Sequence, residues 1–179
     1  ETDEQVIDYE SDLKNFTTSL AGYKDILNEG TEGRIFFNLK KVDHILKGMK
    51  RGEVCFLMGR SGAGKTTIAL NLIRNAIVNQ KHNVVFNSLE LNSENIVPQL
   101  LQIHKDETEG KVANSVLENK LNEEDERFIN IMDKRLRIVD RPGQTVDDIE
   151  NYALMANEIF DKPLSMIVID YFQYIKMKN

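Results

Sequence analysis

The chain has 179 residues, of which 41% are hydrophobic and 29% charged, and these fractions are typical of a soluble globular protein rather than of a disordered or membrane protein. No apolar run approaches the roughly 20 residues that cross a bilayer, and no basic and apolar leader opens the sequence, so we expect a cytoplasmic protein without membrane contacts. The formal net charge of −6 works against nonspecific phosphate binding by the surface as a whole, because such binding needs clustered basic residues. Any contacts with nucleic acid must therefore be local.

The first element along the chain is an amphipathic helix. Its apolar residues recur at alternating spacings of three and four, which places them on one helical stripe. The stripe consists of Val6, Tyr9, Leu13, Phe16, Leu20, Tyr23 and Leu27. It suits packing against another subunit or against the body of this chain, and both alternatives stay open. Turn residues at 28–33 end the helix, so we expect an N-terminal helical unit at 1–30 and a second domain at 31–179.

Strand and helix patterns alternate after residue 30. Apolar strand runs are expected at 53–58, 83–88, 136–140 and 165–170, and helical patterns at 65–79, 93–104 and 146–160. This alternation predicts an α/β fold with a mostly parallel sheet flanked by helices, joined by right-handed crossovers. Thr145 and Asp148 predict an N-cap for the helix at 146. The acid-rich stretch 105–126 predicts a solvated excursion with one short helix.

The single cysteine and the three histidines predict no catalytic or metal site. Cys55 lies inside an apolar run, which predicts a buried, inert thiol. His44, His82 and His104 are scattered, are expected at the surface, and form no zinc-ligand spacing with Cys55. A serine or cysteine nucleophile also lacks a neighbouring base in the pattern, which favours hydrolysis by activated water.

A glycine-rich segment carries the strongest functional signal. It consists of Gly59, Arg60, Ser61, Gly62, Ala63, Gly64, Lys65 and Thr66, followed by Thr67. The glycines let backbone amides point at an anion, and the helix that follows adds its positive end. Lys65 can then neutralise the outer phosphates, and the Thr66 hydroxyl is placed to hold Mg²⁺. The segment predicts a site for ATP and magnesium, and the flanking strand and helix distinguish it from an accidental glycine-rich turn.

Two carboxylates follow other strands. Asp170 ends the run 166–170, where a P-loop ATPase places the acid that orients magnesium; an ordinary strand-end Asp is the alternative. Glu90 follows the strand at 83–88 at the edge where ligands of parallel sheets collect. It is the candidate general base for the attacking water, with a surface Glu as the alternative. Gln173 is a candidate ligand of the terminal phosphate or of that water, and a solvated Gln is the alternative.

Four segments, in order, resemble the motor domain of DnaB-type replicative helicases. They are 48–54 leading into the phosphate loop, Phe-Asn-Ser-Leu-Glu-Leu at 86–91, 136–148, and the Asp-Tyr-aromatic-Gln run within 167–175. The resemblance covers about residues 35–175 and implies a RecA-like P-loop fold that hydrolyses ATP to unwind DNA during replication. It implies that Lys65 and Thr66 act on phosphate and magnesium, with Asp170 behind the metal. It also implies Glu90 as catalytic carboxylate and Gln173 as a sensor linking nucleotide to DNA.

Other positions refine this resemblance. Arg60 matches an arginine frequent in these helicases, whereas Ser61 replaces a frequent proline. The family implies a hexameric ring on single-stranded DNA, a primase or loader partner, and docking of the helix at 6–27 on a neighbouring subunit. It also implies DNA-contacting loops, an arginine that reaches a neighbour's nucleotide, and a further strand, all later in the sequence. We therefore expect a longer natural protein and a gap in the sheet of this chain.

Two other functions stay open at this point. The first is a RecA-like recombinase or regulatory DNA-associated ATPase that does not unwind duplexes, which the residues at 48–54 fit equally well. The second is a nucleotide-gated interaction module with negligible turnover. Strand displacement would distinguish the first from a helicase, and slow hydrolysis that depends on Glu90 would exclude the second.

Overall fold

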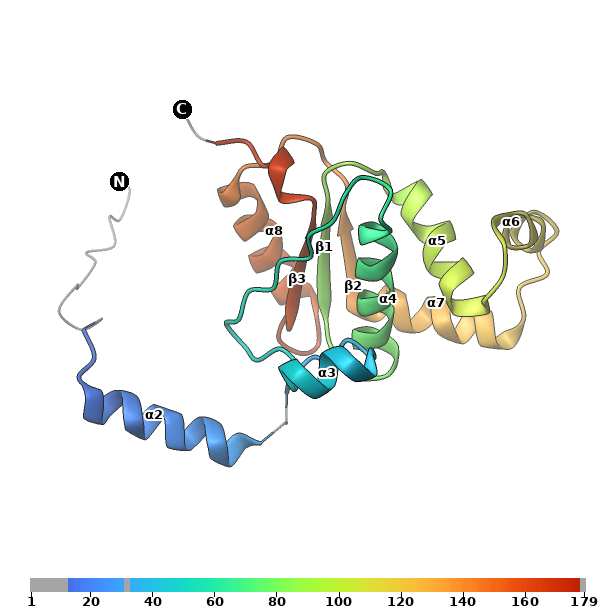
Figure 1. The fold of residues 1–179 in the computed structure, drawn as a ribbon. Helices are drawn as coiled ribbons and strands as arrows, with labels where there is room; N and C mark the ends of the chain where they lie inside the picture. The colour runs from blue at the N-terminus through green and yellow to red at the C-terminus, as the bar shows by residue number, and fades with distance from the viewer. Residues whose placement is uncertain (1–12, 31–32, 178–179) are drawn as a thin grey trace. The chain divides into compact units, whose positions relative to one another are not determined.

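The computed structural model of the protein describes residues 13–30 and 33–177 (Figure 1). The chain separates into two compact units, Glu1–Gly33 and Arg34–Asn179. Within the described ranges, no helix is long and apolar enough to span a membrane.

The first unit contains the helix α2, Phe16–Glu29. Asn15 caps its start, because the Asn15 side chain accepts a hydrogen bond of 2.9 Å from the Thr18 backbone amide. The described members of the apolar stripe are exposed, at 82% for Leu13, 82% for Phe16, 42% for Leu20 and 54% for Tyr23. Val6, Tyr9 and the Leu27 side chain lie outside what the structure describes.

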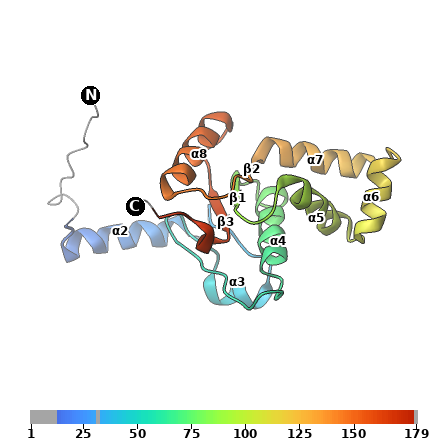
Figure 2. The ribbon, with the colours of Figure 1, turned by 90° about the horizontal axis from the view of Figure 1, so that it is seen from above.

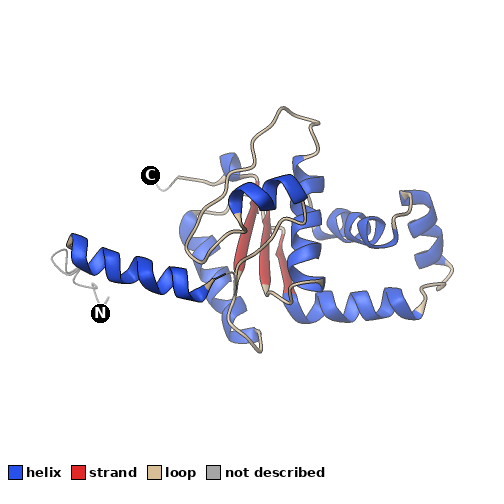
Figure 3. Cartoon of the chain, turned by 60° about the horizontal axis from the view of Figure 1, so that its bottom comes forward, coloured by secondary structure: helices blue, strands red, loops and turns tan. Residues whose placement is uncertain are grey.

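A parallel sheet of three strands forms the centre of the second unit (Figure 3). Strand β1 (Val84–Ser88) lies between β2 (Leu136–Val139) and β3 (Met166–Asp170), and both neighbours run parallel to it. All five residues of β1 are buried, as expected for a parallel strand with both faces covered. The predicted α/β class and the strands expected at 83–88, 136–140 and 165–170 are confirmed.

Helices cover both faces of this sheet (Figure 2). On one face, α4 (Lys65–Val78) and α5 (Ser93–Lys105) share a core with Val84 and Phe86 of β1. On the other face, α8 (Val146–Ile159) packs through Ala156 against Val85. Alternate side chains of β1 therefore pack into two separate hydrophobic cores, one on each face of the sheet. All three helices were predicted, and the capping box of Thr145 and Asp148 at the start of α8 is also confirmed.

The stretch 105–126 holds more helix than expected. The predicted short helix is α6, Glu109–Leu117, but a second helix, α7, spans Glu123–Arg135. Asn122 and Asp125 form a capping box, and all four residues of the first α7 turn are acidic, which suits the positive end of a helix. The prediction of a solvated excursion was wrong at its C-terminal end, because acidic residues favour a helix start as well as solvent.

The strand predicted at 53–58 does not form. Its residues have no strand assignment, and β3 pairs with β1 alone among the described strands. The apolar side chains of this run are exposed, at 79% for Val54, 64% for Phe56 and 87% for Met58. A strand requires a neighbour for its backbone hydrogen bonds, so an unpaired run here agrees with the gap that the resemblance implies. Cys55 is exposed, and the prediction of a buried thiol is wrong.

The segment before this run contains α3, Lys40–Leu46, which was not predicted. The Asp43 carboxylate accepts hydrogen bonds from the backbone amides of Phe37 and Leu39, at 2.8 and 3.1 Å. The Phe36 amide donates to the Gln80 side chain at 2.8 Å, so the segment is fastened to the end of α4. The bond between Phe36 and Gln80 joins residues 44 positions apart in sequence. The Asp43 bonds are local, but they involve backbone amides and leave no apolar periodicity to detect.

Two of the three histidines are partly buried. His44 is exposed as predicted, whereas His82 and His104 are half-buried. The His104 ring stacks on Phe128 with 4.0 Å between centroids. Burial is the largest cause of the lowered pKa of both His82 and His104. The prediction of surface histidines is therefore wrong for these two.

A buried ion pair joins α5 to α7. The Lys105 Nζ atom lies 2.7 Å from Asp125 Oδ2, and the side chains are 10% and 2% exposed. Burial by itself raises the pKa of Asp125, but the hydrogen bonds from Lys105 and from the Asn122 amide outweigh burial and hold this pKa below its ordinary value. Loss of one partner would leave a buried, uncompensated charge.

Lys105→Ala should lower the free energy of unfolding by about 3 kcal/mol. Lys120→Ala is the control, because it breaks an exposed pair with Glu118 and should cost less than about 1 kcal/mol. Urea unfolding followed by circular dichroism measures both. Because folding lowers the Asp125 pKa, the contribution of the pair is complete above the ordinary carboxyl pKa and is lost as pH falls through the lowered one. Equal losses in the two variants would contradict this account.

Candidate functional site

Residues 59–66 form a tight turn that leads into α4. Gly62 and Gly64 have φ angles of 75° and 82°, which side-chain-bearing residues rarely adopt. The Ala63 amide donates to the Arg60 carbonyl at 3.2 Å, and Gly64 caps the helix. The first amides of α4 have no partner within the helix, and its positive end lies at this turn. Residues 59–63 are exposed, so the turn is open to an anion.

The Lys65 side chain folds back across this turn. Its Nζ atom donates to the carbonyls of Gly59 and Arg60, at 3.1 and 3.0 Å. The ammonium group therefore lies against the turn formed by residues 59–66. Thr67 follows in the first turn of α4, where its carbonyl accepts a hydrogen bond from Asn71.

Thr66 and Asp170 bring α4 and β3 together. The Thr66 hydroxyl donates to Asp170 Oδ2 at 2.7 Å, and Asp170 is 7% exposed. A hydroxyl and a carboxylate are oxygen ligands of the kind that Mg²⁺ prefers. Within the described ranges, no group of three His, Cys, Asp or Glu residues could hold a metal. Magnesium fits this pair because it normally completes its shell with water and phosphate oxygens.

Glu90 lies on a loop that is anchored at both sides. The Ser88 hydroxyl donates to the Leu91 carbonyl at 2.6 Å and accepts from the Leu91 amide at 3.2 Å. The Leu89 amide donates to the Asp170 carbonyl at 2.8 Å, which ties the loop to β3. Glu90 is exposed. These bonds hold it at the carboxyl edge of the sheet, the same edge as Asp170.

Asp140 fixes the other end of this loop. Its carboxylate accepts a hydrogen bond of 2.8 Å from the Ser93 amide at the start of α5, and this bond is the largest cause of its lowered pKa. Glu90 and Asp140 line a shared hollow of about 290 Å³. Neither Ser88 nor Asp140 was predicted to support the site. The Asp140 contact joins residues 47 positions apart in sequence, so no local pattern reveals it.

Tyr171 follows Asp170 directly after the end of β3. Its ring lies 4.5 Å from that of Tyr174, centroid to centroid. A hydrogen bond with Tyr174 is the largest cause that raises the pKa of Tyr171 to about 12, and the charges of Glu90 and Asp170 add to it. Tyr171 was not predicted as a site residue, although the Asp-Tyr-aromatic-Gln run contains it.

Gln173 stands apart from this cluster. It lies in a 3₁₀ turn, Phe172–Tyr174, and its side chain is exposed. Among the described residues, no hydrogen bond joins this side chain to the phosphate loop, Glu90 or Asp170. Its role as a sensor stays a prediction.

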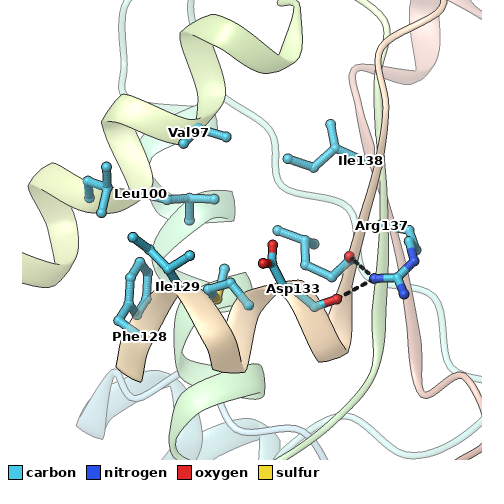
Figure 4. Close-up of a pocket in the computed structure, with 10 residues that line it drawn as sticks. Val97, Leu100, Phe128, Ile129, Asp133, Arg137 and Ile138 are labelled. Carbon is cyan, nitrogen blue, oxygen red and sulfur yellow. Dashed lines mark hydrogen bonds between the residues drawn. The ribbon is translucent and has the colours of Figure 1, made fainter. Parts of the chain in front are cut away.

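A second hollow lies where α5, α7 and β2 meet (Figure 4). It has a volume of about 230 Å³ and is lined mainly by apolar side chains such as Leu100, Phe128 and Ile138. Arg137 also lines it, but one of its nitrogens donates to the carbonyls of Asp133 and Leu136, at 2.6 and 2.7 Å. No phosphate-loop residue lines this hollow, so it does not suit a triphosphate.

The sequence is similar to the C-terminal domains of DnaB-like helicases. The family model of the DnaB-like helicase C terminal domain matches residues 35–179. A probable replicative DNA helicase of Guillardia theta is 28% identical over 150 residues, which cover 80% of this chain and 24% of that protein. The replicative DNA helicase DnaB of Mycoplasma genitalium is 28% identical over 144 residues, covering 78% and 30%. The chain thus spans less than a third of either relative.

Solved structures share the fold. One of them, an ATPase domain, has a TM-score of 0.74 at 19% identity, over 93% of this chain and 60% of that one. A DnaB-like replicative helicase, studied with its primase interactions, has a TM-score of 0.72 at 20% identity, over 95% and 42%. At this level of identity the likeness shows the fold, and it confirms the expected RecA-like architecture.

Proposed function

The chain belongs to the family of DnaB-like helicase C-terminal domains, and on this premise we propose that it is the ATP-hydrolysing motor domain of a replicative DNA helicase. The observation that carries the proposal is the 2.7 Å hydrogen bond between Thr66 and Asp170. It joins the end of a phosphate-binding turn to a buried strand-end carboxylate, the pairing that a P-loop ATPase needs. The chain covers only part of its relatives, so unwinding is a proposal for the complete protein.

ATP binds along residues 59–67 in this proposal. The backbone amides of the turn and the start of α4 receive the phosphates, and the Lys65 ammonium shares their negative charge. Thr66 and Asp170 would hold magnesium through their side-chain oxygens. When bound, the metal neutralises charge on the phosphate oxygens. The short distance between these two side chains supports this assignment.

Glu90 acts as the general base. It accepts a proton from a water molecule whose oxygen bonds to the terminal phosphorus, while the bond from that phosphorus to ADP breaks. The anchoring of the loop by Ser88 and by the Asp170 carbonyl supports this role, because a base must be held in position. Gln173 senses whether the terminal phosphate is present and links this nucleotide state to DNA binding.

The proposed partners follow from the family. The complete protein forms a homo-oligomer, a hexameric ring that translocates on single-stranded DNA in the cytoplasm, and a primase or a loader binds it. The exposed apolar stripe of α2 supports docking of this helix on a neighbouring subunit, since exposed apolar side chains gain stability when they are buried. A linker-type helix and an ATPase domain are thus the proposed roles of the two units.

The complete protein should displace a strand from forked DNA when ATP is present, and its ATPase rate should rise with single-stranded DNA. Lys65→Ala should abolish both activities, because the charge that faces the phosphates is lost. Lys111→Ala, on the exposed surface of α6, should leave both unchanged. ATP hydrolysis without strand release would instead favour the recombinase or regulatory alternative, and unchanged turnover in Lys65→Ala would contradict the site.

Glu90→Gln should reduce turnover by roughly 100-fold or more while ATP binding persists, because the amide keeps the shape but cannot accept the proton. Single-turnover hydrolysis and calorimetric titration with magnesium nucleotide measure the two effects. Glu94→Gln, four residues further on and exposed, is the matched control. Turnover equal to that of the parent protein would show that Glu90 is a surface residue.

Phe16→Ser together with Leu20→Ser should weaken assembly of the complete protein, because both replacements remove apolar surface from the exposed stripe of α2. Lys24→Ser, exposed on the same helix, is the control. Sedimentation velocity should show smaller species for the double variant than for the parent protein and the control. A parent protein that sediments as a monomer at micromolar concentration would rule out the proposed ring.

A further inference from the structure

Basic residues concentrate in one short segment of an otherwise acidic chain. Residues 34–53 contain six basic and two acidic side chains, whereas the whole sequence carries a formal charge of −6. The two acidic groups are engaged locally: Asp43 accepts from the Phe37 and Leu39 amides, and Glu53 accepts from the Lys50 amide. The positive charge of this segment is therefore only partly balanced nearby.

The fold adds further cations to this segment. The Arg34 guanidinium donates to the Lys47 carbonyl at 3.1 Å, and the Arg135 guanidinium donates to the Lys81 carbonyl at 2.7 Å. Arg51 and Arg135 both act on His82, whose pKa is lowered first by burial and then by these charges. We call Arg34, Lys47, Arg51, Lys81 and Arg135 the cationic edge.

The cationic edge lies at the opposite end of the sheet from the phosphate loop. Lys81 comes just before β1 begins at Val84, whereas Glu90 comes just after β1 ends at Ser88. Figure 1 shows α3 and the C-terminal end of α4 at this end of the strands. A five-residue strand spans roughly 17 Å, so the cationic edge is separate from the nucleotide site.

Within the part of the chain that the structure describes, no residue of the cationic edge forms an ion pair with a carboxylate. The ion pairs there involve Lys105, Lys120, Arg127 and Arg141, none of which belongs to the edge. Its two bonded guanidiniums donate to neutral acceptors, namely backbone carbonyls and the Asn83 side chain. Lys47, Arg51 and Lys81 are exposed. Uncompensated, accessible cations are what a phosphate backbone recognises.

We propose that the cationic edge binds the phosphate backbone of nucleic acid at a surface separate from the nucleotide site. The inference rests on the proposed function only in that the complete protein works on DNA, and the contact itself needs no ATP. An acidic protein is the competing partner, because Ile45 and Leu46 of α3 are exposed, at 76% and 50%, beside the edge. The unpaired charges favour nucleic acid, whose phosphates carry charge at regular intervals.

The test uses the complete protein without nucleotide and a fluorescent oligothymidylate, with anisotropy measured over a salt series. Lys47→Gln together with Arg51→Gln should make the slope of log affinity against log salt less negative by about 1.4, at about 0.7 per lost contact on a single strand. If the parent protein and the double variant bind equally at about 1 M salt, the variant should therefore bind roughly 25-fold more weakly than the parent at about 0.1 M salt. Lys81→Gln alone should change the slope by about 0.7, which keeps the test valid if the double variant does not fold.

Lys111→Gln together with Lys120→Gln is the matched control, since it removes the same charge from the exposed region around α6. Its slope should equal that of the parent protein. An unchanged slope in the cationic-edge variants, an equal change in the control, or weakened binding of polyglutamate with unchanged DNA binding would each overturn the proposal. ATP hydrolysis without DNA should be normal in the cationic-edge variants. If Lys65→Ala retains turnover while the slope still changes, the motor assignment fails and the cationic edge stands.

Discussion

The hydrogen bond from the Thr66 hydroxyl to the Asp170 carboxylate joins two segments that are 104 residues apart in sequence. The phosphate loop is not held by a strand of the described sheet, because the run before it is unpaired. Its position depends on α4, whose buried side chains Leu70, Ile73 and Ile77 pack into the core beside β1. The hydrophobic contacts thus place the helix, and the polar bond at its first turn orients the loop toward the carboxyl edge of the sheet.

Carboxylates that follow different strands lie together at the carboxyl edge of the sheet. Asp170 ends β3, Glu90 follows β1, and Asp140 follows β2. Because parallel strands end at the same edge, residues far apart in sequence meet there without any special connection. The opposite edge carries cations. The chain is therefore acidic overall and yet keeps its two charged surfaces at opposite ends of one short sheet.

Local signals were enough to predict most of the second unit. The helices α4, α5 and α8 follow from apolar periodicity and capping residues, and β1, β2 and β3 follow from short apolar runs. The phosphate loop is recognisable because its glycines, lysine and threonine are contiguous. The features that were predicted wrongly or missed depend on contacts with other residues. The run 53–58 becomes a strand only beside another strand, and the raised pKa of Tyr171 arises only from the groups around it. The acidic residues at the start of α7 are compatible with a solvated loop and with a helix start, and only the capping contacts distinguish these two alternatives.

The exposed thiol of Cys55 has a practical consequence. The 179-residue chain contains one cysteine, and it is exposed on the unpaired run four residues before Gly59. A maleimide dye would therefore attach at one known point next to the phosphate loop. If another strand covers this run in the complete protein, the labelling rate would fall, so the kinetics of thiol modification would report whether the sheet has been completed.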